Sequence, residues 1–314
     1  MTFSRRSILA TLAAAAVLAG CGSAPTQPAA PVAAAPAPAP LPLRHVRIGL
    51  ALGGGAARGF AHIGVIKALE AQGIVPDIVV GTSAGSVVGA LYASGYNGFE
   101  LQKIALDMEE TTISDWAIPF FSKAPGVLKR EALQDYVNKA VHNRPIENLK
   151  MPCGAVATDL KTGQPILFRR GNTGMAVRAS SAVPGVFQPV VIGRRTYVDG
   201  GLVAPVPVRF AKEMGAEFII AVNISSATEA QATASSMDVL MQTFTIMGQR
   251  LNQFELKSAD VVITPALGAM GSADFNGRNL AVLAGEQAAA GVMAELKARL
   301  KAKPITPAPM TAAR

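Results

Sequence analysis

The chain has 314 residues, of which half are hydrophobic and 16% are charged, and its formal net charge is +8. This length and composition are typical of a globular protein that is large enough to bury a substantial core. The lysine and arginine residues form no dense basic run, so the positive charge does not indicate a nucleic-acid-binding protein. A mildly basic surface would suit an anionic membrane face.

The first 20 residues have the pattern of an export signal. Two arginines precede an apolar run over residues 8–18, which is shorter than the roughly 20 residues that span a bilayer. The run ends in LAGC, which resembles the lipobox of bacterial lipoproteins. The resemblance implies cleavage after residue 20, a diacylglycerol on Cys21 and, because Gly22 rather than Asp follows, an outer-membrane anchor facing the periplasm. An ordinary signal peptide with a chance cysteine is the alternative, and export by the Sec or the twin-arginine route stays open.

Residues 21–44 and 301–314 are rich in Ala and Pro. Such segments cannot bury a core and favour extended conformations. We expect the first to be a tether that follows the lipidated cysteine and the second to be a disordered tail. The interval 45–300 is then expected to form one domain.

Strands and helices are predicted to alternate through this domain. Apolar runs of strand length predict strands at 46–52, 76–80, 152–157, 165–169, 190–198, 217–223 and 260–264. Helices are predicted at 60–72, 86–93, 236–257 and 276–300, and residues 98–145 are expected to be mostly helical with polar loops. This alternation indicates an α/β fold with a largely parallel sheet covered by helices on both faces.

A glycine-rich loop, GGGAARG over residues 53–59, follows the first predicted strand and opens a helix. Glycines let the backbone approach a ligand, and free N–H groups beside a helix N-terminus bind anions. Either a phosphate or the oxyanion of an acyl-transfer intermediate would fit. The dinucleotide fingerprint and the P-loop both fail to match, because their glycine or lysine positions are not met. A plain tight turn is the remaining alternative.

The stretch VGTSAGS over residues 80–86 lies between a predicted strand and a helix of small residues. Its G-x-S-x-G pattern is typical of a nucleophile elbow, in which Gly81 and Gly85 leave room for a strained turn. The pattern predicts Ser83 as a nucleophile.

Such a serine needs a base, and histidine is the usual one. His45 begins the first strand, His62 is expected to have a packing role, and His142 lies near a helix end. No histidine follows position 142, so the order of an α/β-hydrolase triad is missing. Only Asp107, Asp115 or Asp135 could supply the acid of a triad with His142, and none of them follows a strand, so a histidine triad is disfavoured.

Asp199, in YVDGG after the strand at 190–198, is another candidate base. An aspartate before two glycines can also simply begin a turn.

Taken together, GGGAARG, GTSAG and DGG, in this order, resemble the three signatures of the patatin-like phospholipase family. The stretch GLALGGGAARGFAHIGVIKALE is similar to the bacterial branch of that family and to the catalytic domain of neuropathy target esterase. VATDLKTG and ASSAVPGVFQPV are also similar to family segments. The resemblance implies a three-layer α/β/α sandwich with a mainly parallel central sheet, and hydrolysis of lipid acyl esters by a serine–aspartate dyad without histidine, metal or cofactor.

The resemblance also implies roles for individual residues. Ser83 would be the nucleophile and Asp199 its base, which we expect to be partly desolvated and close to Ser83. The N–H groups of Gly54, Gly55 and Ala56 would form the oxyanion hole. Supporting positions are Gly53, Arg58, Gly59, Gly81, Gly85 and Gly200. The family commonly has glycine at the position of Ala56, where a positive φ would cost alanine on the order of 1 kcal/mol.

Two further features are less specific. Cys153 lies in an apolar segment and is expected to be a buried hydrophobic residue. The only tryptophan, Trp116, clusters with Phe120 and Phe121. These aromatic side chains would line an acyl pocket, form an interfacial cap, or belong to the ordinary core.

The sequence therefore predicts a lipid-anchored hydrolase of phospholipids or lysophospholipids. The alternatives are an esterase or thioesterase for small acyl substrates, and a catalytically silent lipid-binding envelope lipoprotein.

Overall fold

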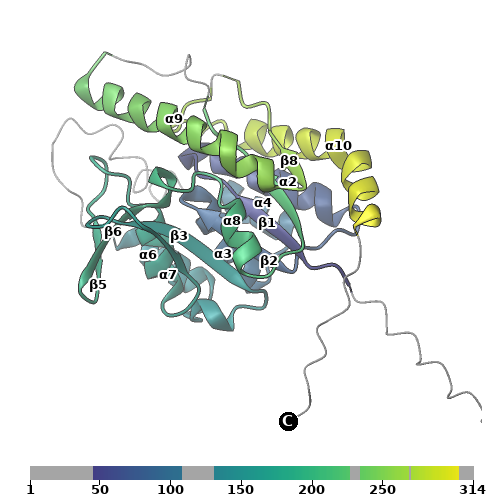
Figure 1. The fold of residues 1–314 in the computed structure, drawn as a ribbon, viewed down its shortest axis with the longest axis horizontal. Helices are drawn as coiled ribbons and strands as arrows, with labels where there is room; N and C mark the ends of the chain where they lie inside the picture. Colours follow the sequence, from purple (N-terminus) through teal and green to yellow (C-terminus); the bar gives the residue numbers. More distant parts are fainter. Residues whose placement is uncertain (1–44, 108–130, 227–233, 269, 304–314) are drawn as a thin grey trace, which may run out of the picture. The chain divides into compact units, whose positions relative to one another are not determined.

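The fold is taken from a computed structural model, which describes residues 45–107, 131–226, 234–268 and 270–303. The predicted leader and Cys21, the cluster around Trp116, and residues 304–314 lie outside these ranges. Figure 1 shows the described elements in sequence colours.

The centre of the domain is a mixed, mainly parallel sheet whose strands pair in the succession β5-β6-β3-β2-β1-β7-β8, and β4 also pairs with β3. The parallel strands are β1 (Ile48–Leu52), β2 (Ile78–Thr82), β3 (Cys153–Asp159), β7 (Phe218–Val222) and β8 (Val261–Ile263). Three strands run antiparallel to their neighbours: β4 (Pro165–Phe168), β5 (Val190–Ile192) and β6 (Arg195–Asp199). Every residue of β1, β2, β3 and β7 is buried, which explains their continuous apolar sequences.

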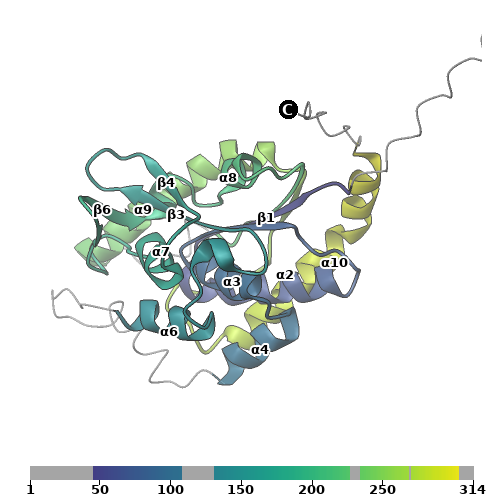
Figure 2. The ribbon, with the colours of Figure 1, turned by 90° about the horizontal axis from the view of Figure 1, so that it is seen from below.

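Helices cover both faces of the sheet, as Figure 2 shows from below. On one face lie α2 (Phe60–Glu70), α3 (Ala84–Ser94), α4 (Gly98–Asp107), α6 (Ala132–Ala140), α7 (Thr173–Ser180) and α10 (Arg278–Ala302). On the other face lie α8 (Val208–Glu213) and α9 (Ser236–Glu255). Short 3₁₀ turns, η1 (Ala56–Gly59), η2 (Ile146–Asn148), η3 (Gly200–Leu202) and η5 (Leu256–Ser258), complete the described elements. The predicted three-layer α/β/α sandwich is confirmed.

The two layers of core differ in size because successive strand residues point to opposite faces. On β1, Leu50 and Leu52 contribute to the larger core beneath α2 and α10. Ala51, between them, belongs to a smaller core that includes Val208 and Phe210 of α8. Most of the buried apolar surface of the domain therefore lies on the α2 and α10 side.

The predicted strand at 190–198 is wrong in one respect, because it is a hairpin of β5 and β6. Gly193 has φ +61° and begins a two-residue turn, a conformation that glycine adopts without strain. The short helices α7 and α8 were not predicted, and α10 continues to Ala302, into the expected tail. Within the described residues, no helix combines the length and the apolar character that crossing a membrane requires.

Candidate active site

The pairing of β3 brings two distant parts of the chain together. Its residues 153–156 pair with β2, its residues 157–159 pair with β6, and residues 155–158 pair with β4. Since β4 pairs along residues that also pair with β2 or β6, those two strands must share the opposite edge of β3. They run toward each other and end at adjacent positions, with Thr82 opposite Val156 and Asp199 opposite Ala157. Ser83, which follows β2, is therefore brought next to Asp199.

Ser83 occupies a strained turn between β2 and α3. Its backbone has φ 51° and ψ −122°, a region that a non-glycine residue seldom adopts. The turn is so tight that a Cβ on Gly81 would lie 2.2 Å from the Gly85 carbonyl oxygen, and a Cβ on Gly85 would lie 2.2 Å from the Leu52 carbonyl oxygen. Both glycines of the G-x-S-x-G pattern are thus required by close backbone approach, and the serine side chain is presented at the tip of the turn.

Two other serines hold this turn in shape. The Ser83 N–H donates to Ser180 Oγ at 2.9 Å, and that hydroxyl donates to the Val156 carbonyl at 2.6 Å. Ser86 Oγ donates to the Ser83 carbonyl at 2.7 Å. Sequence analysis did not single out Ser180. It falls in the family-like segment ASSAVPGVFQPV, but only the tertiary structure reveals its contact with the turn.

Asp199 is the last residue of β6 and only 6% exposed. Its backbone is fixed on both sides, because its N–H donates to the Ala182 carbonyl at 2.9 Å and its carbonyl accepts from Thr158 Oγ1 at 2.7 Å. Oδ1 accepts from the Gly201 N–H at 2.6 Å. Oδ2 is buried and has no hydrogen-bond partner among the described residues.

The environment of this carboxyl makes it a better base than an ordinary aspartate. Burial raises the pKa of Asp199 to about 6, while the Gly201 N–H and the nearby Ser83 hydroxyl act in the opposite direction. Oδ2 is thus left to accept a proton, while the Ser83 hydroxyl lies close enough to the carboxyl to favour its ionised form.

The glycine loop contributes free backbone donors. The N–H of Gly54 donates to the Pro205 carbonyl at 2.9 Å, so it is already engaged, and its predicted place in an oxyanion hole stays a prediction. The N–H groups of Gly55 and Ala56 donate to no acceptor among the described residues. Ala56 has φ 49°, so the predicted strain at this alanine is present.

Two buried basic side chains support the loop. The Arg58 guanidinium donates to the backbone carbonyls of Ile224, Ser225 and Met270 at 2.7, 3.0 and 2.8 Å. His62 Nε2 lies 2.8 Å from the Gly53 carbonyl oxygen, and burial lowers the pKa of this histidine to about 4. The ring is therefore neutral at physiological pH and must carry its proton on Nε2 to bond a carbonyl. Both side chains serve the loop rather than an anion.

The remaining predicted supporting glycines lie where the motifs imply. Gly53 follows β1, Gly59 ends η1 and Gly200 begins η3. A Cβ on Gly200 would lie 2.1 Å from the Val156 carbonyl oxygen, so a side chain there would push β6 away from β3.

The other histidines and the cysteine have no part in this arrangement. His45 is exposed and its ring contacts Asp77 at 3.0 Å, while His142 is exposed in the turn after α6. Neither lines the pocket beside Ser83. Cys153 is a buried free thiol, as predicted, and burial raises its pKa to about 12.

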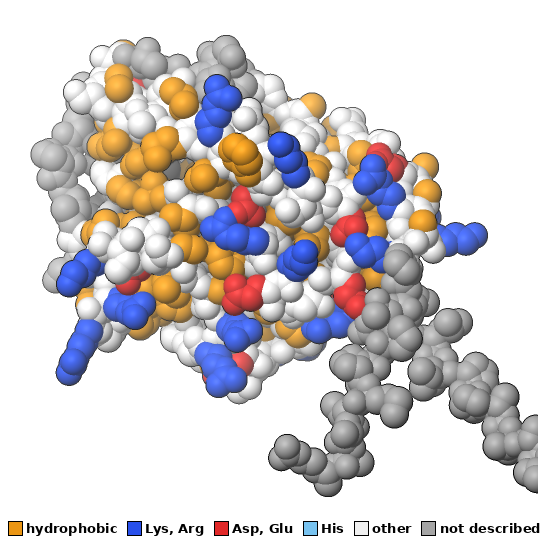
Figure 3. All heavy atoms as spheres, in the orientation of Figure 1, with side chains coloured by type: hydrophobic (Ala, Val, Ile, Leu, Met, Phe, Trp, Pro, Cys, Tyr) orange, Lys and Arg blue, Asp and Glu red, His pale blue; other side chains and the backbone are white. Residues whose placement is uncertain are grey.

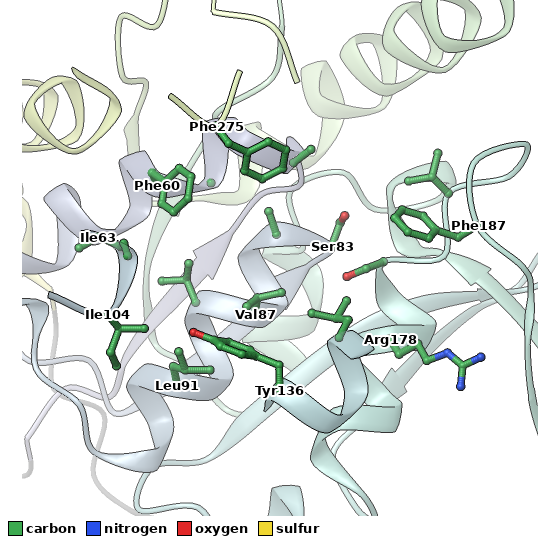
Figure 4. Close-up of a pocket in the computed structure, with 18 of the residues that line it drawn as sticks. Phe60, Ile63, Ser83, Val87, Leu91, Ile104, Tyr136, Arg178, Phe187 and Phe275 are labelled. Carbon is green, nitrogen blue, oxygen red and sulfur yellow. The ribbon is translucent and has the colours of Figure 1, made fainter. Parts of the chain in front are cut away.

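An apolar pocket extends from Ser83 between the helices on the α2 and α10 side of the sheet, as Figure 4 shows. Successive residues of α3, including Val87 and Leu91, form one wall. The rest is lined by side chains of α2, α4 and α6 and of two loops, namely Phe60, Ile63, Ile104, Tyr136, Phe187 and Phe275. The pocket can take an unbranched apolar chain whose end lies at the serine hydroxyl. Trp116 and its neighbours lie outside the described residues, so their predicted contribution stays a prediction.

Fold and site together define an α/β/α protein with a serine elbow that opens into an apolar pocket. Residues 50–212, just over half of the chain, match the family model of patatin-like phospholipases. The chain belongs to the patatin-like phospholipase family.

Several characterised and uncharacterised proteins are similar to this chain. An uncharacterized NTE family protein of Mycobacterium tuberculosis is 39% identical over 193 residues, which cover 62% of this chain and 53% of that protein. Patatin-like phospholipase domain-containing protein 6 of Homo sapiens is 32% identical over 186 residues, 58% of this chain and 14% of that protein. Lysophospholipase NTE1 of Scheffersomyces stipitis is 30% identical over 216 residues, 66% of this chain and 13% of that protein. The chain thus spans about half the length of the first of these relatives and much less of the others.

Among solved structures, VipD from Legionella pneumophila aligns with a TM-score of 0.48 and 13% identity. The alignment covers 82% of this chain and 67% of VipD.

Proposed function

We propose that the protein is a serine acyl hydrolase that cleaves acyl esters of phospholipids or lysophospholipids, with Ser83 as nucleophile and Asp199 as base. The observation that carries the proposal is the meeting of β2 and β6 on one edge of β3. This brings a strained serine beside a buried carboxyl with an unpartnered oxygen, at the end of an apolar pocket.

In the first step Asp199 Oδ2 accepts the proton of Ser83 as Oγ attacks the ester carbonyl carbon. The negative charge that develops on the carbonyl oxygen is stabilised by the N–H groups of Gly55 and Ala56. One such donor contributes roughly 2.7–4 kcal/mol to lowering the barrier. The protonated Asp199 then gives its proton to the leaving alcohol, and an acyl-serine ester remains.

In the second step a water molecule attacks this acyl-enzyme and Asp199 accepts its proton. The tetrahedral intermediate collapses, the fatty acid leaves, and the proton returns to Ser83. A pKa of about 6 supports both roles, since the carboxyl is largely ionised at pH 7 and yet basic enough to take a proton.

The lipid substrate is supported by the apolar pocket and by relatives whose names state phospholipase or lysophospholipase activity. An esterase or thioesterase for small acyl substrates is the second candidate, because a short acyl group also fits at Ser83. A series of esters with acyl chains of 2 to 18 carbons separates the two. Our proposal expects kcat/KM to rise with chain length as the pocket fills.

A fluorophosphonate probe tests whether the protein is an enzyme at all. We expect covalent labelling of the wild type and none of Ser83→Ala, together with a loss of turnover of at least about 10⁴-fold. Labelling that persists in Ser83→Ala, or a folded wild type that is not labelled, would leave the silent lipid-binding protein as the better description.

Lipid attachment at Cys21, with anchoring in the outer membrane facing the periplasm, remains part of the proposal. Metabolic labelling with a tagged fatty acid should mark the wild type and not Cys21→Ser. Cell fractionation of the same pair tests the location.

A further inference from the structure

Helix α9 contacts the domain partly through polar side chains. Its only buried residue is Asn252, whose Nδ2 donates to Ser225 Oγ at 2.8 Å. One turn earlier, Gln249 Nε2 donates to the Ser226 carbonyl at 2.7 Å. Hydrogen bonds from polar side chains therefore contribute to the attachment of this helix, whereas a surface helix usually packs through an apolar face.

Several apolar residues of α9 face outward. Met247 is 52% exposed and Phe254 is 70% exposed. These two and three further exposed apolar residues recur at helical spacing and form one stripe, which we call the α9 stripe: Val239, Leu240, Ile246, Met247 and Phe254. Figure 3 shows hydrophobic side chains gathered over α9 on this side of the molecule. Exposed apolar side chains gathered along one side of a helix indicate a contact surface.

The first turn of α9 lies against the loop that lines the pocket. A Cβ on Gly185 would lie 3.2 Å from Met237 Cε and 3.3 Å from Leu240 Cδ2. The neighbours of Gly185 in this loop, Val183 and Phe187, line the pocket beside Ser83. Farther along, α9 packs against η3, which directly follows Asp199. The α9 stripe therefore begins at the rim of the pocket.

The charges on α9 fit an anionic or zwitterionic lipid surface. Its two acidic residues are engaged, since Asp238 forms a capping box with Ser235 and Glu255 forms an ion pair with Arg209. Arg250 is exposed on the same side as the stripe, and Lys257 lies just beyond the helix with its Nζ 5.6 Å from the Phe254 ring centroid. Apolar side chains bordered by basic ones are typical of helices that lie in a membrane interface.

We propose that the α9 stripe is a bilayer-contact surface that seats the mouth of the pocket on a phospholipid membrane. A lipid could then pass from the bilayer into the pocket without its acyl chain crossing water. The contact depends on the face of α9 and not on the chemistry at Ser83, so it can be tested apart from the proposed hydrolysis.

The direct test uses a polarity-sensitive dye on one introduced, exposed cysteine, in the full chain carrying Cys21→Ser so that no acyl group is attached there; the remaining Cys153 is a buried thiol. The dye is placed at Met247→Cys or, as control, at Val75→Cys. Val75 is similarly exposed but lies just before β2, at the end of that strand opposite to Ser83. Vesicles of phosphatidylcholine and phosphatidylglycerol should cause a blue shift and a several-fold rise in fluorescence only at position 247. An unchanged signal there would overturn the proposal.

A second test measures partitioning onto the same vesicles. Met247→Gln/Phe254→Gln should weaken partitioning about tenfold, because two apolar side chains lose their burial in lipid. The matched control is Val75→Gln/Phe99→Gln, whose wild-type side chains are 55% and 68% exposed and lie where the parallel strands begin. This pair should partition like the parent. Both pairs should hydrolyse a water-soluble short-chain ester at the parental rate.

Equal partitioning of the two pairs would contradict the lipid contact. If instead the α9 pair turns a dimer into a monomer in sedimentation equilibrium while vesicle binding is unchanged, the stripe is an interface between copies of the chain, and the proposal is wrong. A chain that binds vesicles through the α9 stripe but cleaves no ester would refute the proposed hydrolysis and leave the bilayer contact intact.

Discussion

The domain contains two strand-to-helix turns on neighbouring strands that both hold a non-glycine residue at positive φ but expose different groups. The glycine loop after β1 has Ala56 at φ 49°, and the elbow after β2 has Ser83 at φ 51°. The elbow exposes a side chain, while the loop exposes N–H groups. We infer that side-chain identity is decisive in the elbow and backbone geometry is decisive in the loop.

The supports of the two turns differ accordingly. Short hydroxyl side chains, Ser180 and Ser86, hold the elbow at close range. The loop is held by longer side chains, Arg58 and His62, which reach backbone carbonyls. The elbow therefore depends on tight packing, whereas the loop is held by hydrogen bonds from two long side chains.

Asp199→Asn should remove the proposed base of Ser83 while keeping the packing around it. Without a base, kcat should fall at least about 10³-fold, while the Asn side chain can still accept the Gly201 N–H. Burial raises the pKa of Asp199, so the stability that this group contributes is full below pH 4 and is lost as pH rises through about 6. Asparagine does not titrate, so the variant does not lose stability in this way. Its free energy of unfolding at pH 7.5 should be about 1–3 kcal/mol higher than that of the wild type. Urea unfolding with parallel ester assays checks both effects.

Full activity in Asp199→Asn would reject the dyad. A chain in which all three histidines are replaced provides the complementary control and should retain turnover if it folds.

Gly85→Ala should break the elbow while leaving its serine in the sequence. The added Cβ would meet the Leu52 carbonyl oxygen at 2.2 Å, so β1 or α3 must shift. We expect a loss of about 1–3 kcal/mol in unfolding free energy and about a hundredfold loss of kcat/KM. Wild-type kinetics and stability would show that the elbow is not as tight as described.

The pH profile should report the carboxyl directly. Because Asp199 acts as a base in its ionised form, kcat/KM should rise about tenfold per pH unit up to about pH 6 and then level off. Circular dichroism over the same range ensures that acid unfolding is not mistaken for titration. A profile that stays flat down to pH 4.5 would contradict the raised pKa.

Ala56→Gly should have the smallest effect. Glycine keeps the N–H donor and adopts the positive φ without strain, but it gains freedom in the unfolded chain. We expect kcat/KM to stay within about threefold and the unfolding free energy to change by less than about 1 kcal/mol. A large loss of activity would mean that the alanine methyl group, which lines the pocket, contacts substrate.

Much of this architecture could be predicted from sequence because its signals are local. The apolar runs predicted the parallel strands, and the G-x-S-x-G and D-G-G motifs predicted the two residues that the fold brings together. Gly193, within 190–198, was a signal for the hairpin that sequence analysis did not use. By contrast, nothing near Gly54 in the sequence shows that its N–H is taken by the Pro205 carbonyl. Helix α9 was also predicted, but apolar spacing alone does not tell which of its faces meets the domain.

The meeting of β2 and β6 on β3 has a consequence for how such a protein can diversify. The separation of Ser83 and Asp199 is set by two adjacent pairings on one strand. The chain between α3 and β3 takes no part in those pairings or in the elbow, and it includes α4 and α6, which line the pocket. That segment can therefore change in length or be exchanged as a cassette. The reaction would stay constant while the range of accepted lipids changes.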